Sequence, residues 1–229
     1  MTESFDTARE RLLDAALAHV PFDGWSETTF RAAVADAGID DAVARAICPR
    51  GAVDLALAYH AHGDAAMLAR LRAEDLSALK FRDRIAAAVR FRLEAVEDRE
   101  VVRRGVTLFA LPAHAGEGAR AIWETCDKIW TALGDTSDDV NWYTKRATLA
   151  GVYSSTLLYW LGDGSPGHQA TWDFLDRRIA DVMLVEKLKA QVRQNPLLKP
   201  FMAGPDWLAR QIRPPARMPD LPGRLSPRD

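Results

Sequence analysis

Helical patterning is the feature that most constrains the fold of this chain. Strict alternation of apolar and polar residues is rare, whereas Ala, Leu, Arg and Glu dominate long stretches, a composition that favours helix over strand. Glycine and proline interrupt these stretches, as at Gly38, Pro112 and Gly134. The pattern predicts an all-α fold with helices over residues 4–19, 26–36, 40–47, 51–74, 76–97, 99–110, 115–133, 139–161 and 166–193.

The N-terminal helices have a specific arrangement. Three short predicted helices in residues 4–47, followed by a long helix, resemble the N-terminal part of TetR-type repressors. Within the turn Ala37-Gly38-Ile39-Asp40, glycine ends one helix and aspartate begins the next. The resemblance implies a TetR-repressor-like helical bundle of about nine or ten helices. It also makes a TetR-type, ligand-responsive transcriptional regulator the alternative function.

Charge argues against DNA as a partner. The formal net charge is -2, so the chain has no global basic field, and residues 26–55 hold three basic and five acidic side chains. The third helix begins Asp40-Asp41, where a repressor usually presents Lys, Thr and Tyr. Because nucleic-acid affinity rests mainly on cations that neutralise phosphates, we expect no nucleic-acid partner. The regulator alternative depends on Arg45 and Arg50.

Sequence motifs for catalysis or metal binding are missing. The five histidines form no HExxH or ExxH pattern, and His60 and His62, two residues apart on a predicted helix, point to different sides. There is no GxSxG motif, and the two cysteines, Cys48 and Cys126, have no CxxC neighbour, which indicates buried thiols in a reducing compartment. The sequence therefore predicts a non-enzyme without catalytic residues, metal or cofactor.

Residues 137–183 contain the most informative pattern. On a helical wheel one side holds Trp142, Arg146, Tyr153, Leu157 and Trp160. Core or dimer packing accounts for most such aromatic side chains, although Trp, Tyr and Arg are also favoured at the centres of protein interfaces. The amphipathic helices at 139–161 and 166–189 are suited to pairing with their symmetry mates, so we expect a homodimer.

The same region resembles a known family. The segments NWYTKRATLAGVYSSTLLYWLGDGSP and TWDFLDRRI look like those of coenzyme Q (ubiquinone) biosynthesis protein nine. The segments ALAHVPFDGWSETTF, PRGAVDL and LFALP fit the same family, so the resemblance covers residues 5–185. It implies a TetR-like fold that does not act on DNA, and a dimeric, non-catalytic accessory protein that binds isoprenoid lipid in an apolar pocket.

The resemblance also implies partners. The lipid would be an isoprenoid quinone precursor or a phospholipid, and the protein partner would be the di-iron demethoxyubiquinone hydroxylase. The patch that meets this hydroxylase would include Trp142, Tyr143 and Arg146. In this hypothesis the helical shell holds part of the lipid tail and presents the ring to the hydroxylase. The candidate lining residues of the pocket are Leu108, Phe109, Trp130, Tyr153 and Leu157.

The C-terminal part has a different composition. Residues 186–229 hold nine basic and four acidic side chains, in contrast to the acidic residues 1–60. Residues 194–212 form a proline-interrupted amphipathic segment, whose positive charges suit a membrane surface. Packing of this segment onto the protein's own core is the alternative. The residues expected to enter the membrane are Leu197, Leu198, Phe201, Met202, Trp207 and Leu208.

Four regions follow from these patterns. We expect a helix-turn-helix-like part at 1–50, a lipid-binding and dimerisation part at 51–193, the amphipathic segment at 194–212, and a proline-rich disordered tail at 213–229. No uncharged apolar run approaches the roughly 18 residues of a spanning helix. The N-terminus has neither a secretory signal nor a mitochondrial presequence. We therefore expect a bacterial, cytoplasmic protein, peripherally associated with the inner membrane.

Overall fold

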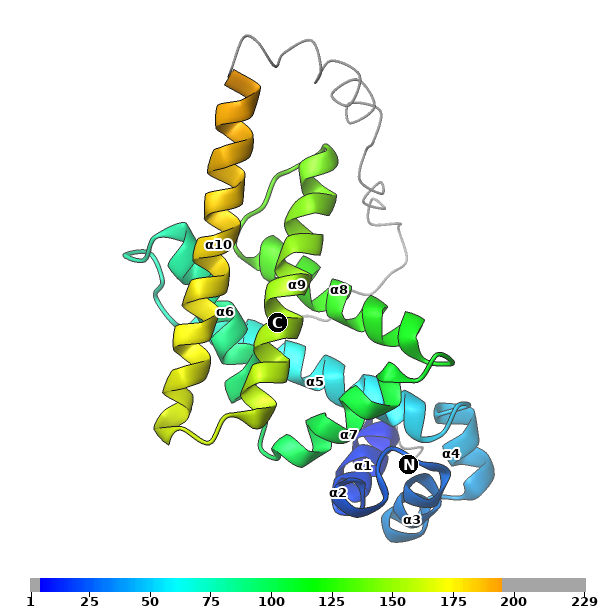
Figure 1. Ribbon diagram of the computed structural model, residues 1–229. Helices are drawn as coiled ribbons and strands as arrows, with labels where there is room; N and C mark the ends of the chain where they lie inside the picture. The colour runs from blue at the N-terminus through cyan, green and yellow to red at the C-terminus, as the bar shows by residue number, and fades with distance from the viewer. Residues whose placement is uncertain (1–4, 195–229) are drawn as a thin grey trace.

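The computed structural model describes residues 5–194, and these residues form helices without a strand. The α-helices are α1 (Phe5–Leu17), α2 (Val20–Asp23), α3 (Glu27–Ala37), α4 (Asp41–Ile47), α5 (Ala52–Ala73), α6 (Phe81–Glu94), α7 (Arg99–Ala110), α8 (Ala115–Ala132), α9 (Val140–Gly162) and α10 (Gln169–Gln194), with a 3-10 turn at Pro166–His168. The all-α prediction is confirmed. Figure 1 shows α1–α4 gathered at one end of the molecule, with α9 and α10 running side by side at the other.

The N-terminal helices start and stop where the sequence indicates. Ser26 accepts a hydrogen bond from the backbone N–H of Thr29 and so caps α3, while Gly38 ends that helix with a φ of 61°. Asp40 caps α4 by accepting hydrogen bonds from the N–H groups of Ala42 and Val43. Helix capping therefore explains Asp40, the first of the two aspartates at the start of α4, without a ligand.

Two apolar cores share the long helix α5. The first joins α1–α5 and α7, and its fully buried members include Leu12, Val20, Phe30 and Leu55. The second joins α5, α6, α8, α9 and α10, with Met67, Leu93, Ile129 and Leu175 among its buried members. Packing is continuous across the boundary expected at residue 50, because α5 contributes to both cores.

Two local features differ from the predicted pattern. Residues 76–80, expected to open the helix at 76–97, instead belong to a connection, in which the carboxylate of Asp75 accepts a hydrogen bond from the N–H of Ser77. Arg84 holds this connection by donating to the carbonyls of Ser77 and Leu79. In addition, residues 20–23 form the separate short helix α2, because Pro21 sits in its first turn and Gly24 ends it with positive φ.

Several predictions concern residues 195–229. The membrane-entering side chains between Leu197 and Leu208, and the tail at 213–229, lie outside the described residues. Among residues 5–194, no helix combines the length and the apolar composition that crossing a bilayer requires.

Gly118 sets the distance between α7 and α8. A Cβ atom at this position would lie 2.6 Å from Cβ of Phe109, an atom that cannot move without its backbone. We expect Gly118→Ala to lower the free energy of unfolding by about 1–3 kcal/mol through overpacking. Urea denaturation measures this change. Gly116→Ala in the same helix is the matched control, because a Cβ there meets open space. Equal stability of the two variants would contradict the close approach.

Candidate functional site

A cavity of about 370 Å³ lies among α5, α6, α7, α8 and α9. Its wall is mostly apolar and includes Ala56, Leu93, Val96, Val101, Val102, Val106, Ala121 and Ile122. Its exposed lining residues Ala110, Ala119 and Leu158 mark the opening between α7, α8 and α9. This volume falls in the range of small-molecule sites, and the wall suits an apolar ligand.

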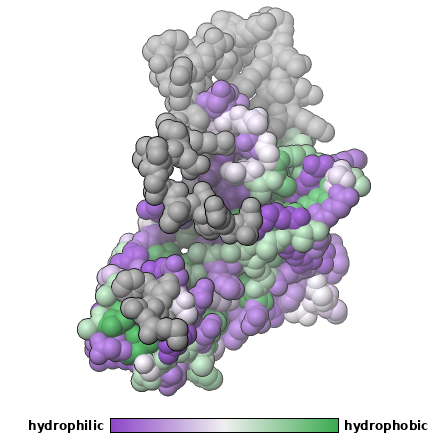
Figure 2. Space-filling view, turned by 180° about the vertical axis from the view of Figure 1, so that it is seen from behind, coloured by the Kyte–Doolittle hydropathy of each residue, from purple (hydrophilic) through white to green (hydrophobic). Residues whose placement is uncertain are grey.

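Hydrophilic and apolar residues are mixed on the face seen from behind. Figure 2 shows this mixture over the N-terminal helices and the α5–α6 region on that face. In the cavity, apolar side chains surround an internal space.

Three of the five predicted lining residues reach the cavity. Phe109 on α7, and Tyr153 and Leu157 on α9, contribute to its wall. Leu108 does not, because the next residue along a helix points about 100° away, and it packs on the N-terminal core instead. Trp130 does not line the cavity either. It is buried in the second core and donates its indole N–H to the carbonyl of Lys145.

Polar side chains occupy one part of this wall. Tyr59 and His60 come from α5, Arg92 from α6, and Tyr153 from α9. His60 Nε2 is 2.8 Å from the hydroxyl oxygen of Thr125. Burial, together with the nearby Arg92 guanidinium, lowers the pKa of His60 to about 4, so its imidazole is neutral near pH 7. Sequence analysis did not identify these polar lining residues other than Tyr153.

A buried carboxylate supports the polar part of the wall. Asp64 on α5 is 1% exposed. It accepts hydrogen bonds from Arg92 Nε at 2.8 Å and from Lys128 Nζ at 2.7 Å. The hydroxyl of Thr125 donates to the same carboxylate at 2.9 Å. Asp64 thus joins α5 to Arg92 of α6 and to Lys128 of α8.

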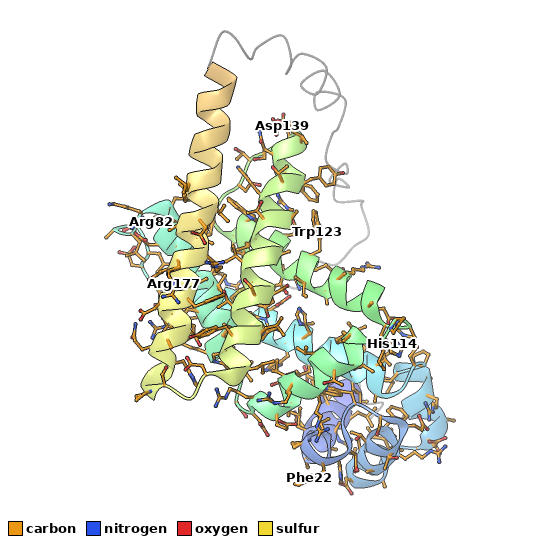
Figure 3. All side chains as sticks on the ribbon, in the orientation of Figure 1. Phe22, Arg82, His114, Trp123, Asp139 and Arg177 are labelled. Carbon is orange, nitrogen blue, oxygen red and sulfur yellow. The ribbon has the colours of Figure 1, made fainter. Side chains whose placement is uncertain are left out.

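An aromatic cluster lies where α8 meets the first turns of α9. It consists of Trp123, Trp142 and Tyr143, with ring centroids 4.8–6.3 Å apart. Figure 3 shows Trp123 beside the part of α9 that begins after Asp139. The three side chains are half-buried. The sequence prediction included Trp142 and Tyr143 but missed Trp123, which lies on another helix.

Arg146 belongs to the interior and not to the exposed patch that was predicted. Its side chain is fully buried and donates to Asp127 at 2.6 Å and to Asp135 at 3.0 Å. Its guanidinium also lies 4.0 Å from the ring centroid of Trp142. Arg146 lies one turn after Trp142 on α9, and the fold brings the two carboxylates to it. Arg146 therefore positions the aromatic cluster from its buried side, through its contact with Trp142.

The cations of the N-terminal helices are paired with carboxylates. Arg45 forms an ion pair with Glu27. Arg50 pairs with Asp54 at 2.6 Å and also with Glu117 of α8. Both arginines on which the regulator alternative depends thus have carboxylate partners within the protein.

These features define a class: an all-α protein with the TetR-repressor fold that encloses an apolar cavity. The fold is similar to the crystal structure of a TetR transcriptional regulator from Nitrosomonas europaea, with a TM-score of 0.63 over 76% of this chain and 97% of that one. The two sequences are 19% identical, so this similarity concerns the fold alone.

Sequence similarity is more specific. Residues 115–186 match the COQ9 family model. The chain is 31% identical to the mitochondrial ubiquinone biosynthesis protein COQ9 of Drosophila melanogaster, over 81% of this chain and 58% of that protein. It is 31% identical to the protein of the same name from Rattus norvegicus, over 84% of this chain and 64% of that one, and 29% identical to that of Homo sapiens, over 84% and 63%. The chain is thus similar to COQ9 proteins over 81–84% of its length, as the sequence resemblance predicted, and it spans 58–64% of the length of these relatives.

Asp135 makes the α8–α9 junction sensitive to acid. Burial alone raises the pKa of Asp135, but hydrogen bonds from Lys145, Ser137 and Arg146 outweigh it and lower that pKa from 3.8 to about 2. A depressed carboxyl pKa adds stability above the unfolded value, which is lost as the pH falls through the folded value. We expect about 2 kcal/mol of the free energy of unfolding to disappear between about pH 4 and pH 2.

Urea denaturation at a series of pH values measures this loss. Asp135→Asn should be less stable at pH 7 and should show a smaller loss over the same acid range. Asp139→Asn, an exposed change that keeps a helix-capping side chain, is the control. If Asp135→Asn and the wild type lose the same stability in acid, the assignment to Asp135 is wrong.

Proposed function

We propose that this protein takes part in ubiquinone biosynthesis as a non-catalytic accessory protein that binds an isoprenoid lipid. It would present a polyprenylated quinone precursor to the di-iron demethoxyubiquinone hydroxylase. The observation that carries the proposal is the apolar cavity of about 370 Å³ inside a chain that matches the COQ9 family model over residues 115–186. The relatives that it matches are named as ubiquinone biosynthesis proteins.

The position of the cavity opening supports delivery to a partner. Ala119 lines the opening on α8, and Trp123 of the aromatic cluster follows one turn later on the same helix. A hydroxylase bound at Trp142 and Tyr143 would therefore sit close to the route by which a ligand leaves. Aromatic anchors of this kind are favoured at the centres of interfaces.

The homodimer remains part of the proposal. The outer faces of α9 and α10 expose Tyr159 at 40% and Leu184 at 58%. A Cβ at Gly151 or Gly162 would meet open space, which leaves α9 accessible to a close helix partner. A symmetric contact through residues 139–161 and 166–189 would cover these side chains.

Association with the cytoplasmic face of a membrane rests on residues 194–212 and on the insolubility of the lipid.

A TetR-type regulator is the second candidate, and the fold is what favours it. DNA binding needs basic side chains free to contact phosphates. Glu27 and Asp54 form ion pairs with Arg45 and Arg50, and α4 has Asp40 and Asp41 at its start. The electrostatics of the described N-terminal helices thus favour the accessory role over the regulator.

Mass spectrometry of organic extracts from the purified protein tests lipid binding. We expect an isoprenoid quinone, its precursor or a phospholipid in the wild-type extract. Ser154→Trp should deplete it, because Ser154 lines the cavity and the indole fills the space. Ser155→Trp is the matched control, since the neighbouring residue is not part of the wall. Wild-type extracts free of lipid, or equal lipid in both variants, would rule out this cavity as the lipid site.

The hydroxylase contact has its own test. We expect Trp123→Ala or Tyr143→Ala to weaken hydroxylase binding by about 2 kcal/mol, if each ring anchors the interface. Calorimetry with the purified hydroxylase gives the affinity, and thermal melting reports folding. Phe22→Ala, which truncates a 79% exposed ring in α2, is the control. Unaltered affinity in both cluster variants would remove the patch from the proposal.

A further inference from the structure

Two tyrosine hydroxyls face the cavity without a partner in the protein. Tyr153 is 2% exposed and Tyr59 is half-buried, and both line the cavity. Among the described residues, neither hydroxyl makes a hydrogen bond, although both lie within electrostatic reach of the Arg92 guanidinium. Each hydroxyl is open to the cavity space, so it is available to donate a hydrogen bond to an oxygen atom of a ligand there.

Arg92 adds a third donor to the same place. Its Nε donates to Asp64 and its Nη2 donates to the backbone carbonyl of His60 at 3.0 Å, whereas Nη1 makes no hydrogen bond with the described residues. The guanidinium is held against α5 because Gly63 has no side chain: a Cβ there would lie 2.5 Å from Nη1. Tyr59, His60, Arg92 and Tyr153 together form the polar pole of the cavity.

The groups of the polar pole that are left without a partner among the described residues are hydrogen-bond donors, so the pole is suited to a hydrogen-bond acceptor on the ligand. The Thr125 hydroxyl donates to Asp64, so His60 Nε2 must carry the proton that it shares with Thr125. The other ring nitrogen of His60 faces Arg92 Nη2 at 3.4 Å, so His60 has no spare proton to offer. The donors left are the two tyrosine hydroxyls and Arg92 Nη1. Burial raises the pKa of Tyr153, which keeps its hydroxyl protonated near pH 7.

We propose that the polar pole binds the acceptor oxygen of a lipid head group, such as a carbonyl or phenolate oxygen of a quinone-type ring. The ligand then enters head first, and its apolar chain runs along Val106 and Phe109 to the opening at Leu158. This inference rests on the proposed function and changes it in one respect. The ring is held inside until it is released, while a long tail, too large for this volume, stays outside.

The charge of Arg92 supports this preference. Arg92 lines the cavity and is 5% exposed, and in a low-dielectric wall a guanidinium attracts the partial or full negative charge of an acceptor oxygen. A carboxylate on an alkyl chain offers the same acceptor oxygens as a quinone-type ring. The shared chemistry is therefore an acceptor oxygen at the end of an apolar chain.

Binding of three short probes tests the polar pole in the full-length protein. The probes are 2-decyl-1,4-benzoquinone, decanoate and decylbenzene, followed by the quenching or shift of tryptophan fluorescence. We expect the wild type to prefer at least one oxygen-bearing probe over decylbenzene. Tyr153→Phe and Tyr59→Phe should each reduce that preference about fivefold, the effect of one lost hydrogen bond, and leave decylbenzene binding unchanged. A preference for the quinone assigns the pole to a ring oxygen, and a preference for decanoate assigns it to a carboxylate.

Tyr159→Phe is the matched control, because Tyr159 lies on the same helix and is absent from the cavity wall. Thermal melting separates a structural role from ligand contact: Tyr153→Phe should not lower the melting temperature, since its hydroxyl has no partner in the described protein. Equal binding of all three probes, or Tyr153→Phe and Tyr59→Phe variants that behave like Tyr159→Phe, would overturn the polar pole while leaving lipid binding intact. Failure of every probe to bind would overturn the pole and the proposed lipid function together.

Discussion

The buried carboxylate of Asp64 is the interaction on which the architecture of the cavity depends. A carboxylate at 1% exposure is costly unless cations and hydrogen-bond donors satisfy its oxygens. Arg92 of α6 and Lys128 of α8 donate hydrogen bonds to this carboxylate from two different helices, at 2.8 and 2.7 Å. Because α5 provides the anion, these three helices are held in the one arrangement that brings both cations to it. The space between them is a consequence of that fixed geometry.

A second buried ion-pair network performs a similar role at the α8–α9 junction. Arg146 is surrounded by Asp127, Asp135 and the ring of Trp142, and it fixes α9 against α8. The aromatic rings outside this network are consequently presented from a rigid base. Residues of α8 and α9 line the cavity and also form the aromatic cluster. The cavity and the proposed partner surface therefore lie on the same pair of helices.

The sequence predicted the helices well because their signals are local. Caps such as Ser26 and Asp40, and a break at Gly38, determine helix ends within a few residues of the chain. The cavity wall was predicted in part. Helical periodicity identifies which residues share a side, as with Tyr153 and Leu157, but it does not tell core from cavity wall. Asp64 is separated in sequence from Arg92 by 28 positions and from Lys128 by 64 positions, so no local pattern could reveal their contacts.

The N-terminal helices also have a structural task. Trp25, in the connection between α2 and α3, lines the cavity, contacts the ring of Tyr59 and donates its indole N–H to the carbonyl of Val101 at 3.2 Å. One side of the cavity is therefore built by a segment that precedes α3 in the N-terminal part of the chain. The N-terminal helices thus contribute to the shape of the cavity, because without the segment that holds Trp25 the cavity would lack that part of its wall.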